Sequence, residues 1–100
     1  NSLILVLVNP GHTDQVMDTA KRAGARGGTV IRARWADPDQ TAASKFYGIT
    51  VQSEKELLAI VATAQTRNLI MESINQEHGL DSEAGAIICS LGLDNVVRLN

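Results

Sequence analysis

The chain has 100 residues, of which 44% are hydrophobic and only 3% aromatic, and its formal net charge is −2. This length fits a single domain over residues 1–100, with a core of aliphatic side chains. There is no basic excess to neutralise a phosphate backbone, which argues against a nucleic-acid partner. A lone cysteine excludes an internal disulfide and is typical of a reducing, cytoplasmic location. The N-terminal apolar run, residues 3–8, is too short for a signal-peptide core or a membrane span.

The first half of the chain predicts a strand, a helix and a second strand. Residues 3–8 are uninterrupted and apolar, which is typical of a strand buried on both faces. A helix follows from Thr13, its expected cap, with apolar positions at spacings of four and three until Gly24 ends it. Residues 29–35 predict the next strand. Residues 36–45 have no periodicity and many small or polar side chains, so we expect an exposed, mobile loop there.

The second half predicts further strands around one more helix. Residues 46–51 suit a strand or hairpin arm, and the apolar run 57–62 predicts a second strand buried on both faces. We expect a helix from about residue 65 to 79, a main strand over 85–91 and a short tail strand over 95–99. The inner face of that helix is expected to hold Leu69, Ile70 and Ile74. The order predicts an α+β fold, a ferredoxin-like βαββαβ sandwich with an antiparallel sheet and two helices on one face.

The strands are too apolar for such a sheet standing alone. Two helices cover one face of a four-stranded antiparallel sheet, and the other face normally alternates with polar residues. Here the runs 3–8, 57–62 and 86–91 are apolar on both sides. If roughly six such side chains lie on the second face, covering them is worth on the order of 10 kcal/mol per protomer, at about 1.5–3 kcal/mol each. We expect a sheet from an identical subunit to cover this face, because an exposed patch is a liability in a monomer. The alternative is that the 36–45 loop folds back over it.

Four stretches resemble the PII signal-transduction family of nitrogen regulatory proteins: residues 3–8, 24–30 (Gly-Ala-Arg-Gly-Gly-Thr-Val), 53–62 and 94–99 (Asp-Asn-Val-Val-Arg-Leu). The resemblance implies a homotrimer. It also implies that residues 36–46 occupy the place of the family's T-loop, in a shortened form, and engage or release a target protein such as a membrane transporter or a metabolic enzyme. The partner-contacting residues in this loop would be Asp37, Pro38, Ser44 and Lys45.

The resemblance further implies a small effector at the clefts between subunits, an adenine nucleotide such as ADP, AMP or ATP. The matching ligand-binding positions are Gly28, Thr29, Gly85 and Arg98. The chain departs from the family at 83–86, which reads Glu-Ala-Gly-Ala and lacks the family's phosphate-holding lysine. Losing that cation disfavours a polyphosphate. A less charged adenine nucleotide, another small ligand or no ligand therefore stay open.

Structural explanations compete with these assignments. Gly28 and Thr29 also suit the start of a strand, and Arg98 suits a surface ion pair of little energetic weight. Arg32 and Arg34 alternate on one strand face, where a solvated face competes with a place beside the cleft or the loop base.

No enzymatic motif is present, so we expect no catalytic residue and no enzyme activity. An acylphosphatase-like enzyme would need an anion cradle with a water-positioning Asn, which we do not find. The remaining alternative is a metal-binding trimer like the copper-tolerance CutA proteins, which needs clustered soft ligands. The available candidates are Cys89, Met17, Met71 and two histidines, and they form no cluster in the sequence, so we expect no metal site.

Overall fold

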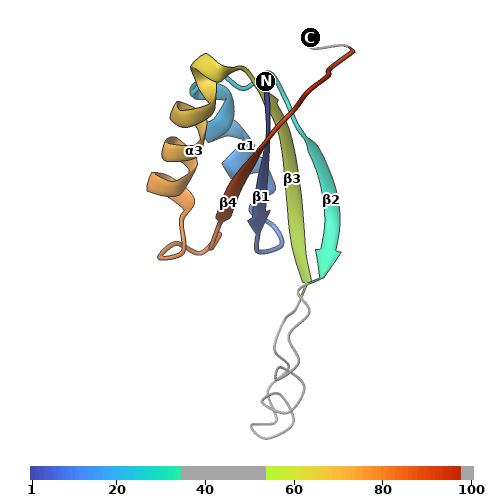
Figure 1. Ribbon diagram of the computed structural model, residues 1–100. Coiled ribbons are helices and arrows are strands. Elements are labelled where there is room, and N and C mark those ends of the chain that lie inside the picture. Colours follow the sequence, from blue (N-terminus) through green and yellow to red (C-terminus); the bar gives the residue numbers. More distant parts are fainter. Residues whose placement is uncertain (35–53, 98–100) are drawn as a thin grey trace, which may run out of the picture.

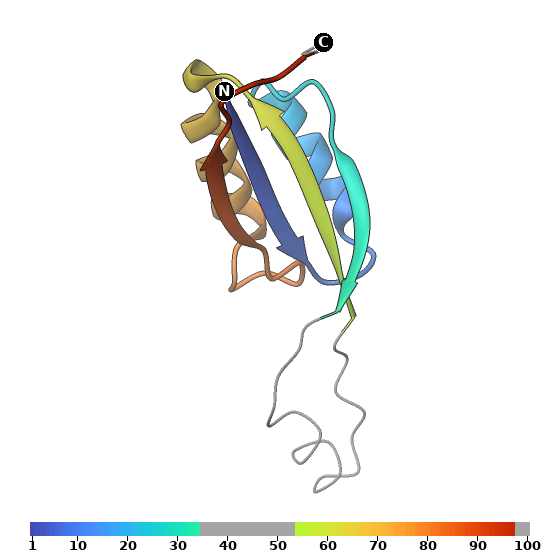
Figure 2. The same cartoon turned by 45° about the vertical axis from the view of Figure 1, so that its right-hand side comes forward.

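The computed structural model describes residues 1–34 and 54–97 of the chain. Both described helices lie against one face of a four-stranded sheet, and no described segment covers the opposite face (Figures 1 and 2). This is the small α+β architecture that the sequence predicts, and it is compatible with a ferredoxin-like fold. The elements are β1 (Ser2–Val8), α1 (Thr13–Arg22), β2 (Thr29–Arg34), β3 (Glu54–Ala62), α3 (Ala64–His78) and β4 (Ile87–Gly92).

The sheet has the strand order β2-β3-β1-β4, and all neighbouring strands are antiparallel. The apolar runs 3–8 and 57–62 thus lie in the two central strands, β1 and β3, which pair with Leu5 opposite Ala59. On its other side Leu5 lies opposite Cys89 of β4. The edges are β2 and β4, and this separation of the two edge strands decides which candidate residues can meet within one chain.

Helix α1 forms where the apolar spacing predicts it. Val16 and Ala20, four residues apart, are completely buried against the sheet. The helix ends before Gly24, whose φ of +116° is a backbone conformation that residues other than glycine rarely adopt. The predicted cap is wrong by one residue: His12 is the N-cap, and Thr13 is the first helical residue and is buried.

Helix α3 buries a narrower stripe than the sequence predicts. Ile70 and Ile74 are fully buried, but Leu69 is 55% exposed, so its assignment to the inner face is wrong. Consecutive helical residues are separated by about 100° of rotation, so a residue next to Ile70 is turned away from the stripe that Ile70 and Ile74 define. The helix ends at Gly79, where an added Cβ would lie 2.5 Å from the carbonyl oxygen of Asn75.

One apolar core lies between the sheet and the helices. It takes alternate residues from each central strand, because successive strand side chains point to opposite faces. The members that are completely buried are Ile4, Val6, Val8, Val16, Ala20, Leu58, Ile60, Ile70 and Ile74. The intervening residues of the same strands face away from the helices.

The remaining predictions have mixed outcomes. Strand β4 lies close to the range expected for it. The predicted tail strand is wrong for residues 95–97, which form no strand. The N–H of Leu93 donates to the carbonyl of Asn1 at 3.0 Å, and beyond this first residue of the chain β1 has no further residue to pair with. The 36–45 loop, the 46–51 strand and residues 98 and 99 lie outside the described residues. No helix in the described ranges is long and apolar enough to cross a membrane.

Candidate functional site

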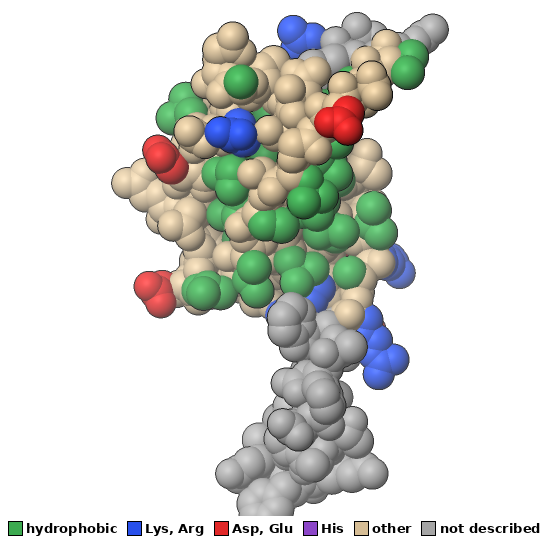
Figure 3. Space-filling view, in the orientation of Figure 1, with side chains coloured by type: hydrophobic (Ala, Val, Ile, Leu, Met, Phe, Trp, Pro, Cys, Tyr) green, Lys and Arg blue, Asp and Glu red, His purple; other side chains and the backbone are tan. Residues whose placement is uncertain are grey.

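The face of the sheet opposite the helices is almost entirely apolar. The strand register places there the residues between the core positions, with Thr29 and Lys55 as the polar exceptions among the described strands. In Figure 3 hydrophobic side chains gather over the strands. We call this surface the open face. It comprises Leu3, Leu5, Leu7, Ile31, Ala33, Leu57, Ala59, Val61, Ile87, Cys89 and Leu91.

The open face is exposed to an extent that is unusual for a single chain. Ile31 is 48% exposed, Ile87 47% and Leu91 53%. Cys89 of β4 is also exposed on this face. Contiguous apolar patches on monomers are normally small, and a larger one marks a surface that another molecule covers.

A polar network closes the end of the sheet where β1 ends and β4 begins. Lys55 Nζ donates to Asn9 Oδ1 at 2.6 Å, and Asn9 Nδ2 donates to the carbonyl of Glu83 at 2.9 Å. The N–H of Asn9 also donates to the carbonyl of Ala84 at 2.9 Å. Gly85 follows with φ +56°, and an added Cβ there would lie 3.0 Å from Asn9 Nδ2. We call these residues the Asn9 network.

The Asn9 network brings a lysine from another strand to the 83–86 turn. Residues 83–86 include no lysine, but the ammonium group of Lys55 on β3 contacts Asn9, which is hydrogen-bonded to this turn. Lys55 is not among the ligand positions predicted from the sequence. A signal was present, since Lys55 stands two residues before Leu57 and interrupts an otherwise apolar face.

The predicted ligand positions do not meet within one chain. Gly28 and Thr29 lie at the start of the edge strand β2, whereas Gly85 precedes the opposite edge strand β4. Two strands separate these edges, so a site that uses both groups needs two chains. Gly28 also has a packing role, because an added Cβ would lie 3.1 Å from the carbonyl oxygen of Ala59. The other predicted positions, Arg98 and the loop residues Asp37, Pro38, Ser44 and Lys45, lie outside the described residues.

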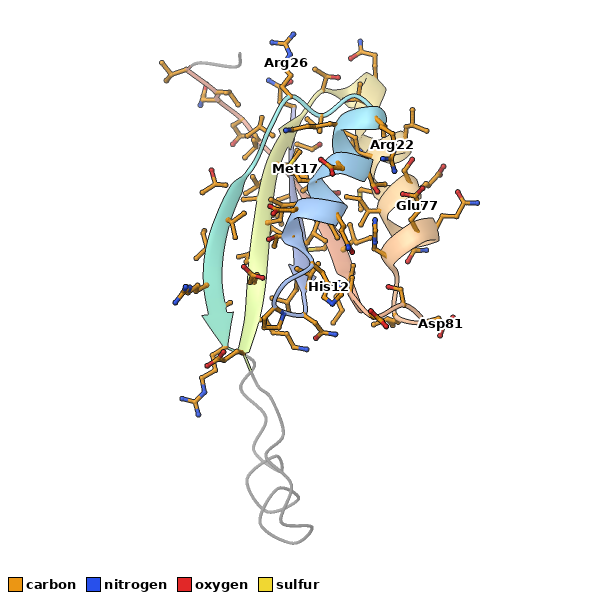
Figure 4. The ribbon with its side chains drawn as sticks, turned by 180° about the vertical axis from the view of Figure 1, so that it is seen from behind. His12, Met17, Arg22, Arg26, Glu77 and Asp81 are labelled. Carbon is orange, nitrogen blue, oxygen red and sulfur yellow. The ribbon has the colours of Figure 1, made fainter. Side chains whose placement is uncertain are left out.

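A second polar cluster joins the two helices. In Figure 4 Arg22 of α1 and Glu77 of α3 point toward each other, and their Nη2 and Oε2 atoms are 3.0 Å apart. The Thr19 hydroxyl donates to Glu77 Oε2 at 2.5 Å and lies 2.8 Å from His78 Nε2. The hydrogen bond from Thr19, with the charges of Arg22 and His78, lowers the pKa of the Glu77 carboxyl below its usual 4.5. These groups satisfy one another, so the cluster links α1 to α3.

Within the described ranges, no group of three or more His, Cys, Asp and Glu side chains could hold a metal ion. What the geometry defines is a small α+β sandwich with one covered face, one open apolar face and a polar network at the end of the sheet. No protein-family model matches the chain, and no curated protein matches it.

Proposed function

We propose that the protein is a PII-like regulatory module that works as a homotrimer, binds a small effector at the seams between subunits and controls a target protein. The observation that carries this proposal is the open face. Covering it removes a large apolar surface from water, which is the dominant favourable term in protein association.

An identical subunit suits this surface better than an unlike partner. The open face is nearly free of charge, so it offers little to select a partner by electrostatic complementarity. A second copy presents the same apolar chemistry, and closed symmetric assemblies are the usual form of soluble oligomers. Association would also protect the unpaired edges of β2 and β4.

The proposed effector site combines residues from two chains. The start of β2 in one subunit supplies Gly28 and Thr29, and the neighbouring subunit supplies Gly85 with the Asn9 network. Lys55 gives that seam a positive charge, which supports an anionic effector such as ADP or AMP, with ATP as a third candidate. Residues 36–46 follow the end of β2, and in this proposal they carry the response to the target, a transporter or a metabolic enzyme.

Calorimetry of the full chain with AMP, ADP, ATP and cyclic nucleotides tests the effector. We expect at least one adenine nucleotide to bind, and Lys55→Gln to weaken that binding by roughly tenfold, the value of one charge-assisted contact. Lys21→Gln is the matched control, since Lys21 is exposed in the last turn of α1 and takes no part in the hydrogen bonds of the Asn9 network. If none of the nucleotides produces heat, the nucleotide-sensor version is wrong.

A further inference from the structure

A cavity with charged walls of both signs lies beside the Asn9 network and shares Lys55 with it. Its volume is about 820 Å³, and it is formed where the turn after β1, the end of β2 and the start of β3 come together. This volume is within the range of roughly 300–1,000 Å³ that small-molecule sites occupy. The charged residues that line it are Asp14, Arg32, Arg34, Glu54, Lys55 and Glu56.

The charges on the two strands are placed for pairing. Arg32 lies opposite Glu56, and Arg34 lies opposite Glu54. They belong to the helix side of the sheet, because they continue the alternation set by Leu58, a core residue. Opposite charges directly across an antiparallel pair normally stabilise each other.

These cross-strand pairs are nevertheless not formed. Glu56 Oε1 instead accepts a hydrogen bond of 2.7 Å from the backbone N–H of Gly11. Within residues 1–34 and 54–97, Arg32 and Arg34 take part in no ion pair, whereas Glu77 pairs with Arg22 and His78 on the helices. Arg32 and Arg34 therefore keep their guanidinium groups available at the cavity, and Glu54 keeps its carboxylate.

The cavity wall opposite the strands is formed by the start of α1, which adds the charge of Asp14 and a helix N-terminus. Asp14 stands in the first turn of α1, and His12, the N-cap, makes no side-chain capping bond there. The first N–H groups of a helix have no partner within the helix. Glu56 is held by Gly11, and the Lys55 ammonium group by Asn9. The charged groups left to meet a ligand are two guanidiniums on β2 and two carboxylates, on β3 and α1. A ligand of one sign would meet like charge, whereas a ligand with both signs pairs with both.

We propose that this cavity binds a small zwitterion, a free α-amino acid. Its carboxylate lies at Arg32 and Arg34, since guanidinium groups bind carboxylates in a bidentate geometry. Its ammonium group lies at Glu54 and Asp14. Neighbouring strands are about 4.8 Å apart, so two charges on one carbon can reach β2 and β3 together. All the residues that line the cavity belong to one chain, so the site needs no second copy, and its proposed contacts use none of the Asn9 network.

The test is calorimetry of the full chain with the standard amino acids. The tightest of them is then compared with its deaminated acid and its decarboxylated amine, which each keep one charge. We expect the amino acid to bind and both analogues to bind at least about tenfold more weakly, because each loses one charge-assisted contact. The proposal is overturned if no amino acid binds, or if the deaminated acid binds as tightly as the amino acid.

Matched variants locate the site. Arg32→Gln and Glu54→Gln each remove one charge from the cavity, and each is expected to weaken binding by about tenfold or more. Lys21→Gln and Glu72→Gln remove the same charges from exposed positions outside the cavity and should leave the affinity unchanged. Equal losses in all four variants would show a non-specific charge effect and overturn the assignment. Nucleotide titrations on the same samples test the seam separately, so either proposal can fail without the other.

Discussion

Two leucines of nearly equal exposure give a direct test of the open face. Leu91 on β4 is 53% exposed on that face, and Leu69 on α3 is 55% exposed on the helix side. In a single chain, Leu91→Lys and Leu69→Lys are equivalent surface substitutions with little effect. If a second sheet covers the open face, only Leu91→Lys places a charge in an apolar interface.

The expected size of this effect follows from the exposure. Covering about half of a leucine contributes on the order of 1 kcal/mol, half of the roughly 1.5–3 kcal/mol for complete burial. Removing an ammonium group from water costs several kcal/mol more. A loss of at least about 3 kcal/mol corresponds to a dissociation constant raised roughly a hundredfold or more.

Light scattering coupled to size exclusion, over a range of protein concentrations, measures this change. Cys89 supplies a second measurement, because its thiol is exposed on the open face of one chain and would be shielded in the assembly. We expect Leu91→Lys to dissociate and to react with a thiol reagent quickly, and Leu69→Lys to behave as the unsubstituted protein does. A single-chain species of the unsubstituted protein with a fast-reacting Cys89, or equal behaviour of the two variants, would refute the reasoning.

Two further predictions concern stability. Gly79→Ala should lower the free energy of unfolding by about 1–3 kcal/mol in denaturant titrations, since the added Cβ would lie 2.5 Å from the Asn75 carbonyl oxygen. An added Cβ at Gly27 would meet no atom within 4 Å, so the free energy of unfolding of Gly27→Ala should stay within about 0.5 kcal/mol of the parent's. Equal effects of the two substitutions would contradict the packing argument. Glu77 has a lowered pKa in the folded state, so its contribution is present above its usual 4.5 and is lost as the pH falls through the lowered value. Thermal melts at a series of acidic pH values should therefore show a smaller loss of stability for Glu77→Gln than for the parent. The control Glu72→Gln should lose stability as the parent does. Parallel pH profiles for all three proteins would show that Glu77 does not contribute in this way.

The spacing of apolar residues predicted secondary structure and burial correctly where one periodicity dominates a segment. Val16 and Ala20 recur at helical spacing and are buried, and residues 3–8 form the central strand that an uninterrupted apolar run predicts. The apolar spacing did not predict burial correctly where two neighbouring apolar residues of a helix could each belong to its buried face. Leu69 and Ile70 are equally apolar, and only the direction of the sheet relative to α3 determines which of them is buried.

The candidate sites were only partly readable from the sequence. Lys55 and Asn9 are 46 positions apart, and their contact depends on the β1–β3 pairing. The unpaired state of Arg32 depends on a hydrogen bond between Glu56 and a turn from another part of the chain. Such contacts carry no local signal, because each residue alone resembles an ordinary solvated charge.

The sequence by itself determined the order of the six described elements and the existence of a second apolar face, since both follow from the period and composition of short segments. Only the tertiary structure decided that Thr29 and Gly85 lie on opposite edges of the sheet, and that charges from α1, β2 and β3 surround one cavity. The physical reason is that strand order and register are set by packing over the whole core, and this packing joins residues that are distant in the chain.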